Sequence, residues 1–216
     1  MAASKLPHAK VTREDWLSAA RDALVSEGVE RVKVALLAER LEVARSSFYW
    51  YFRDREQLLL ALLEQWEGAN TAPIVERAGR PAVTVNEAIL GVFECWADPS
   101  LFDARLEFAV RDWARRDQAV KDRLAAADTL RLEALAALHR RFGCVPREAQ
   151  VRARVQYHSQ IGLFALGVDE PTSQRMELLA DYVEVFSGVP PTDQELARFV
   201  AFVRDLEGGP ERSRKQ

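Results

Sequence analysis

The stretch LLAERLEVARSSFYWYFRDREQLLLALL, residues 36–63, decides the fold of the N-terminal part of this chain. It contains two short helical segments joined by a turn at residues 42–44. The positions that face inward at helical spacing are apolar: Leu37, Ala38, Leu41, Val43, Phe48 and Phe52. Two short helices joined by a turn of three or four residues have the spacing of a helix-turn-helix.

With these residues packed inward, the second segment presents basic, hydroxyl and aromatic side chains on its opposite face. They are Arg45, Ser46, Ser47, Trp50 and Tyr51, flanked by Lys33, Arg53 and Arg55. Guanidinium and hydroxyl groups near a helix N-terminus suit base edges, and basic and aromatic groups suit phosphates. The face is therefore a candidate for binding double-stranded DNA. For Lys33 alone, an equally good alternative is a stem that lies along the surface of the head.

The same stretch resembles the recognition region of tetracycline-repressor (TetR) family transcription regulators. The positions that agree without a gap are Leu37-Ala38, Val43, Ser47-Phe48-Tyr49, Phe52, Arg55 and Leu58. The resemblance implies a three-helix DNA-binding head, a linking helix and an all-α domain for ligand binding and dimerisation. It also implies that Arg45 and Ser47 lie near base edges, and that Tyr49, Tyr51 and Arg55 contact phosphates.

Three positions depart from the family pattern. Glu42 stands where the family prefers Gly in the turn, and a non-glycine residue in the left-handed conformation costs about 1 kcal/mol. Ala44 replaces the usual Ser N-cap of the second segment, a loss of about 1 kcal/mol. Tyr51 replaces a common His and keeps a hydroxyl for phosphate. These departures affect the turn and individual contacts rather than the fold.

Helix signals continue to the C-terminal end, and no strand alternation interrupts them, so we predict an all-α fold. Thr12 with Asp15 reads as a capping-box variant, and Gly28 as a left-handed stop. Residues 70–83 contain Asn, Gly and two Pro and are the best candidate for a loop at a domain boundary. Later helices are predicted over about 118–142, 147–167, 173–187 and 193–206.

The predicted organisation has four parts. Residues 1–11 form a flexible arm, 12–57 a helix-turn-helix DNA-binding domain, 58–207 an effector-binding and dimerisation domain, and 208–216 a disordered tail.

Composition limits where such a protein works. The net charge of −3 argues against indiscriminate coating of nucleic acid, but residues 1–57 hold 10 basic and 9 acidic residues, so the acidity lies downstream. The longest uncharged run, residues 155–168, is shorter than the roughly 20 residues of a membrane span. Two cysteines, without a paired motif, fit a reducing cytoplasm. We expect a cytoplasmic protein with no membrane association, no cofactor and no metal.

Two other function classes compete with DNA binding: a small all-α enzyme and a helical adaptor. An enzyme has weak support, since His139 with Cys144 is the only arguable pair of metal ligands. An adaptor leaves the exposed recognition face unexplained.

The family resemblance implies a small-molecule pocket in the second domain. Its candidate residues are Trp96, Phe102, Phe108, Arg111, Trp113, Tyr157 and His158. An ordinary aromatic core is the alternative for each aromatic residue among them. The bound molecule is expected to be apolar or aromatic and to lower DNA affinity.

A homodimer on a palindromic site is expected, because one short recognition helix reads few base pairs. The predicted interface pairs residues 147–167 with 173–187. The first helix offers Val151, Val155, Gly162, Ala165 and Leu166, and the second Met176, Leu179, Val183 and Phe186. Packing of these stripes within one chain is the alternative.

Overall fold

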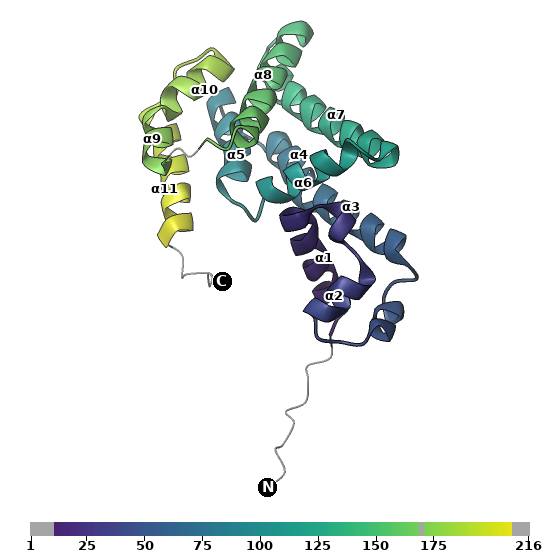
Figure 1. Cartoon of the computed structure of the whole chain (residues 1–216). Coiled ribbons are helices and arrows are strands. Elements are labelled where there is room, and N and C mark those ends of the chain that lie inside the picture. The colour runs from purple at the N-terminus through teal and green to yellow at the C-terminus, as the bar shows by residue number, and fades with distance from the viewer. Residues whose placement is uncertain (1–10, 169–170, 209–216) are drawn as a thin grey trace. The chain divides into compact units, whose positions relative to one another are not determined.

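The structure, a computed structural model, describes residues 11–168 and 171–208, which form helices joined by turns and loops (Figure 1). No strand occurs in these ranges, which confirms the all-α prediction. Apart from Val11 and Gly208, the predicted arm and tail lie outside the described residues. Within the same ranges, no helix is both long and apolar enough to cross a bilayer.

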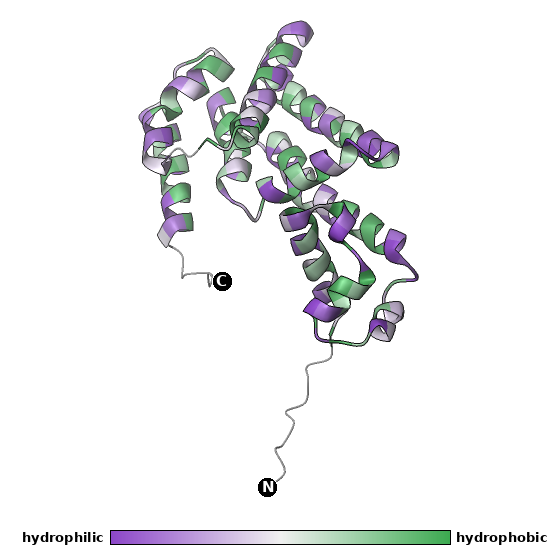
Figure 2. Cartoon of the chain, viewed as in Figure 1, coloured by the Kyte–Doolittle hydropathy of each residue, from purple (hydrophilic) through white to green (hydrophobic). Residues whose placement is uncertain are grey.

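The chain forms two compact units. The first comprises Met1–Trp66 and Arg105–Lys121, and the second Glu67–Ala104 and Asp122–Gln216. The boundary predicted after residue 57 falls inside the first unit, in a helix that continues past it. How function divides along the chain stays a prediction. Along individual helices, hydrophobic and hydrophilic stretches alternate in the manner of amphipathic helices (Figure 2).

The first unit begins with three helices of the head and the helix that follows them. Its elements are α1 (Arg13–Glu27), η1 (Val29–Arg31), α2 (Val34–Arg40), η2 (Arg45–Trp50), most of α3 (Arg55–Asn70) and nearly all of α6 (Ala104–Ala114). The capping box at Thr12 and Asp15 is confirmed, because each residue bonds the other's backbone N–H. Gly28 ends α1 as predicted, but its φ of 85° and ψ of 169° are not the left-handed helical conformation that we expected.

Helix α6 belongs to the first unit although it lies far along the chain from the head. Its Glu107 is fully buried, accepts a hydrogen bond from Trp66 Nε1 at 2.7 Å, and pairs with Arg111 at 2.9 Å. A buried carboxylate is tolerated only when it is paired and hydrogen-bonded. The hydrogen bond between Trp66 and Glu107 therefore fixes α6 to the part of α3 that lies in the first unit.

The second unit holds the remaining helices. They are α4 (Ala72–Gly79), α5 (Val85–Ala97), α7 (Gln118–Arg141, from Asp122 onward), α8 (Pro146–Ala165), α9 (Thr172–Glu177), α10 (Leu179–Ser187) and α11 (Asp193–Gly208). The loop predicted at residues 70–83 is wrong, because α4 occupies most of it; Pro73 lies in the first turn, where its missing N–H costs nothing. The single helix predicted over 173–187 is two helices that meet at Leu178.

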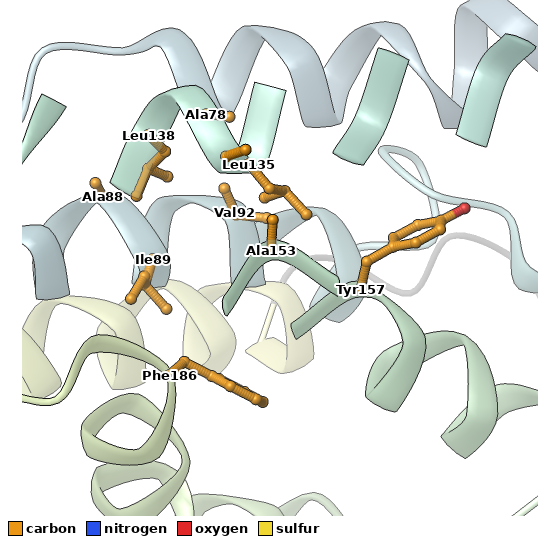
Figure 3. Packing of buried hydrophobic residues seen from close by; sticks show 10 residues of the cluster. Ala78, Ala88, Ile89, Val92, Leu135, Leu138, Ala153, Tyr157 and Phe186 are labelled. Carbon is orange, nitrogen blue, oxygen red and sulfur yellow. The ribbon is translucent and has the colours of Figure 1, made fainter. Parts of the chain in front are cut away.

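The core of the second unit lies where α4, α5, α7, α8 and α10 meet. Figure 3 shows small residues, Ala78, Ala88 and Ala153, beside the larger Ile89 and Leu135. Small side chains on facing helices let the backbones approach closely, and the larger ones fill the space between them. The cluster also includes Val92, Leu138, Tyr157 and Phe186.

A buried cation ties this core to α3 and α4. Arg131 is fully buried and donates from Nε to Thr71 Oγ1 at 3.0 Å and from Nη1 to Tyr157 Oη at 2.8 Å. Tyr157 in turn donates to Asp128 Oδ1 at 2.6 Å, and Asp128 lies 3.4 Å from the Arg131 guanidinium. Asp128 supplies the opposite charge that a buried guanidinium requires.

Replacing Arg131 with Ala should lower the free energy of unfolding by about 3 kcal/mol, because Thr71 and Tyr157 lose a buried partner and a cavity opens. Arg140→Ala removes an ion pair with the exposed Glu133 and should cost less than about 1 kcal/mol. Urea unfolding followed by far-UV circular dichroism compares the two variants. Equal losses in both would show that the buried network adds nothing.

Candidate nucleic-acid interface and ligand cavity

Aromatic packing holds the second segment of the helix-turn-helix against α1. Phe48 and Phe52 are buried, and the Phe48 ring lies 5.2 Å from Trp16 and 5.4 Å from Phe52, measured between centroids. The segment itself, η2, is a six-residue 3-10 helix with no side-chain cap at Ala44. Such a short helix is not stable alone, so its position depends on these rings.

The opposite face of η2 is open to solvent. Arg45 and Ser46 are exposed, and the side chains of Tyr49 and Trp50 are 62% and 70% exposed. Ser47 is half-buried and donates from Oγ to the carbonyl of Ala44 at 2.7 Å. The structure thus brings most of the predicted DNA-contacting residues to one surface, which is the arrangement that groove binding requires.

The flanking residues differ in how their side chains are held. Lys33 is exposed, and Arg53 is largely exposed while it pairs with Asp54 at 2.7 Å. Arg55 donates to the carbonyls of Val32 at 2.6 Å and Val29 at 2.8 Å. Tyr51 donates to the carbonyl of Val11 at 2.7 Å. Arg55 and Tyr51 therefore also fix the first unit internally, and their predicted phosphate contacts stay predictions.

The turn between α2 and η2 places a non-glycine residue in the left-handed backbone region, as the sequence predicts. Glu42 has a φ of 53°, the only positive φ of a non-glycine residue in 11–168 and 171–208. A Cβ in this region crowds the backbone, and most side chains avoid it. Glu42 therefore adopts the conformation that glycine favours, at a cost in the stability of the turn.

Glu42→Gly should raise the free energy of unfolding by roughly 0.5–1 kcal/mol, the relief of the strain less the greater chain entropy of glycine. Glu42→Ala removes the charge and keeps the Cβ, so it should change stability by less than half as much. Thermal unfolding at constant pH and salt compares the variants. A glycine variant no more stable than the alanine variant would contradict the assignment of strain.

A cavity of about 150 Å³ lies in the second unit among α5, α8, α9, α10 and α11. Its apolar wall includes Phe93, Leu163, Met176, Leu179, Phe186 and Phe199. The polar side chains at its edge or in its wall are Trp96, Gln156, Ser159, Gln160, Arg175 and Tyr182. A concave apolar site with a few polar groups is the usual form of a small-molecule pocket.

The predicted ligand residues are distributed over both units. Only Trp96 lines the cavity. Phe102 stacks on Phe164 with centroids 5.7 Å apart, Tyr157 belongs to the Arg131 network, and His158 is exposed. The remaining three lie on α6 in the first unit: Phe108, Arg111 and Trp113. Their part in ligand binding stays a prediction.

Sequence reasoning missed most of the cavity wall. Phe93 is one helical turn before Trp96, so the aromatic spacing on α5 could have pointed to it. Gln156 is fully buried on α8. No sequence pattern predicts that an amide side chain is buried until the residues that pack around it are known.

Two titratable side chains of the second unit, Cys95 and His139, are buried. No group of three or more His, Cys, Asp and Glu residues lies close enough together in them to hold a metal ion. Burial raises the pKa of the Cys95 thiol to about 12, so this thiol stays protonated at neutral pH. His139 is buried against Gln156, and desolvation lowers its pKa.

An apolar surface runs along α8 and α10, which pack against each other. On α8, Val151 and Val155 are exposed at helical spacing. On α10, Tyr182 and Val185 are exposed, and Leu178 precedes them. The predicted stripe on 173–187 is different: Leu179, Val183 and Phe186 are buried within the chain and Met176 is half-buried. The neighbouring stripe of α10 is the one that faces outward.

A family model matches part of the sequence, and solved structures match the fold. The family model for "Bacterial regulatory proteins, tetR family" matches residues 17–62, from α1 into α3. No curated protein matches the chain in sequence. Among solved structures, the reduced form of NemR from E. coli is 17% identical, with a TM-score of 0.59 over 84% of this chain and 99% of that one.

Two further structures share the fold. A putative TetR-family transcriptional regulator from Rhodococcus sp. is 20% identical, with a TM-score of 0.57 over 81% of this chain and 97% of that one. FadR from Bacillus subtilis in complex with stearoyl-CoA is 15% identical, with a TM-score of 0.52 over 92% and 100%. At these identities the likeness establishes the fold.

Proposed function

We propose that this chain, a member of the tetR family of bacterial regulatory proteins, is a homodimeric transcriptional repressor that a small molecule releases from its operator. The observation that carries the proposal is the face of η2, where exposed Arg45, Ser46, Tyr49 and Trp50 stand opposite the buried Phe48. Neither an enzyme nor a helical adaptor explains such a face. Because a transcriptional repressor acts on DNA inside the cell, we place the protein in the cytoplasm.

The side chains on η2 divide into two kinds of DNA contact. Arg45, Ser46 and Ser47 lie in its first turn, from which groups reach base edges in the major groove. Tyr49, Trp50, Lys33 and Arg53 supply hydroxyl, indole and cationic groups for the phosphates on either side. Arg55 contacts a phosphate with the N–H groups that its bonds to Val32 and Val29 leave over. Tyr51 donates its only hydroxyl proton to the Val11 carbonyl, so it must release that bond to donate to a phosphate.

Arg45→Ala should weaken binding to the operator by about 1–3 kcal/mol and relax specificity at one base pair per half-site. Arg204→Ala, a change at an exposed arginine on α11, removes the same charge and should leave affinity unchanged. Fluorescence anisotropy with a labelled operator measures both variants at several salt concentrations. Affinity of the unmodified protein that does not fall with salt would contradict phosphate contacts, since these release counterions.

A second copy of the chain covers the apolar surface of α8 and α10 in this proposal. One η2 segment spans few base pairs, and two-fold symmetry of the protein matches a palindromic site. Val151, Val155, Tyr182 and Val185 offer an apolar strip on two adjacent helices, which with their symmetry mates form a four-helix bundle.

Val185→Asp should therefore convert the dimer to a monomer at micromolar concentration, because a carboxylate in an apolar interface is desolvated without a partner. The matched control is Val83→Asp, since Val83 is 87% exposed and lies in the loop before α5. Sedimentation equilibrium gives the mass of each variant. A dimer that survives Val185→Asp with unchanged affinity would place the interface elsewhere.

Release by a ligand follows from the course of α3. This helix begins with Arg55 beside the DNA face and ends at Asn70 in the second unit, so a ligand that moves its far end also changes the spacing of two recognition segments. A tenfold loss of operator affinity requires about 1.4 kcal/mol of differential binding. FadR from Bacillus subtilis is solved with stearoyl-CoA bound; here we place the effector in the cavity of the second unit. Titrating an effector with and without operator tests the coupling, since each must weaken the other equally.

A further inference from the structure

Two hydrogen-bond donors in the wall of the second unit's cavity have no partner among the described residues. They are the indole Nε1 of Trp96 on α5 and the amide Nε2 of Gln156 on α8, and both atoms are buried. Buried polar groups in folded proteins are nearly always paired, and each exception calls for an explanation. Both atoms donate and neither accepts. A ligand that satisfies them must bring an acceptor oxygen.

A contact with His139 on α7 orients the Gln156 side chain. Its Oε1 lies 3.3 Å from Nε2 of His139, which is fully buried on α7. Burial lowers the pKa of His139, and the neutral tautomer with its proton on Nε2 donates to that oxygen. The amide nitrogen of Gln156 is then the group left for the cavity.

The charge around the cavity favours an anion. Among the described residues that line it, Arg175 on α9 is the only charged side chain. Hydrogen bonds between charged and neutral groups are shorter and stronger than those between neutral groups. A carboxylate therefore gains from both neutral donors and from the nearby guanidinium.

The size of the cavity limits the rest of the ligand. Its volume is about 150 Å³, and an engineered cavity of this volume in another protein holds one benzene molecule. The apolar part of its wall is aromatic and aliphatic, with Phe93, Phe186 and Phe199 among its members. The apolar body of the ligand is thus one ring or a chain of similar volume.

We propose that the cavity binds a compact carboxylic acid, whose carboxylate accepts hydrogen bonds from Trp96 Nε1 and Gln156 Nε2 near Arg175 and whose apolar body lies among the phenylalanines. Only the identification of this acid as the effector rests on the proposed function. Binding of the acid itself is a separate property of the second unit.

Isothermal titration calorimetry of the full chain tests the binding without DNA. The probes are benzoate, phenylacetate, cyclohexanecarboxylate and hexanoate, each compared with its neutral primary amide, and 2-phenylethylamine as a cation of similar size. At least one acid should bind ten or more times more tightly than its amide, and the amine should not bind. Absence of binding by all four acids at millimolar concentration, or equal affinity for acid and amide, would overturn the proposal.

Three variants locate the site. Trp96→Phe and Gln156→Met each remove one donor and keep an apolar side chain of similar size, so each should weaken the acid about tenfold. Trp16→Phe is the matched control, because Trp16 Nε1 is also buried without a partner in the described residues but lies in the first unit. It should leave the affinity unchanged. Acid binding that none of the three changes, or that all three weaken alike, would contradict the assigned site.

Operator binding is measured separately, by anisotropy with and without the acid that binds. Loss of operator affinity in the presence of that acid supports its identification as the effector. A protein that binds the acid but never binds DNA would refute the proposed function and leave the carboxylate site intact. A protein that binds operator but none of the acids would refute the carboxylate site alone.

Discussion

The burial of Phe48 is the interaction on which the DNA-binding part of this protein depends. Its ring contacts Trp16 of α1 and Phe52, with centroids 5.2 and 5.4 Å away. The segment that carries it is a 3-10 helix of six residues, whose own hydrogen bonds are too few to hold it in place. Anchoring one side of this helix in an aromatic core forces the other side, with Arg45 and Trp50, toward solvent.

Helix α3 begins beside the DNA face and is held by hydrogen bonds along its length. At its start, Arg55 bonds the carbonyls of Val29 and Val32, and at its end Asn70 exchanges two hydrogen bonds of 3.0 Å with the backbone of Asp103. Trp66, between them, is buried and bonded to Glu107. Side-chain hydrogen bonds therefore hold α3 at its start, at Trp66 and at its end.

Some buried polar groups of the second unit have hydrogen-bond partners among the described residues, and others do not. Around Arg131 the hydroxyls of Thr71 and Tyr157 are both engaged. At the cavity, Trp96 Nε1 and Gln156 Nε2 have no partner among the described residues. Unpaired buried donors cost free energy, and departures of this kind are most often found at functional sites. The two clusters therefore differ in that the Arg131 side chain bonds two hydroxyls, whereas the two donors at the cavity bond nothing among the described residues.

The sequence alone determined the helical class, the helix-turn-helix and the strained turn at Glu42, because helix caps, apolar spacing and the demand for glycine act over a few residues. It also determined which side of η2 is buried. Only the tertiary structure decided that α6 joins the first unit, that Arg55 bonds backbone carbonyls, and that Gln156 rather than His158 lines the cavity. These outcomes depend on contacts between residues distant in the chain. The spacing of side chains within one helix does not show which other helix packs against it.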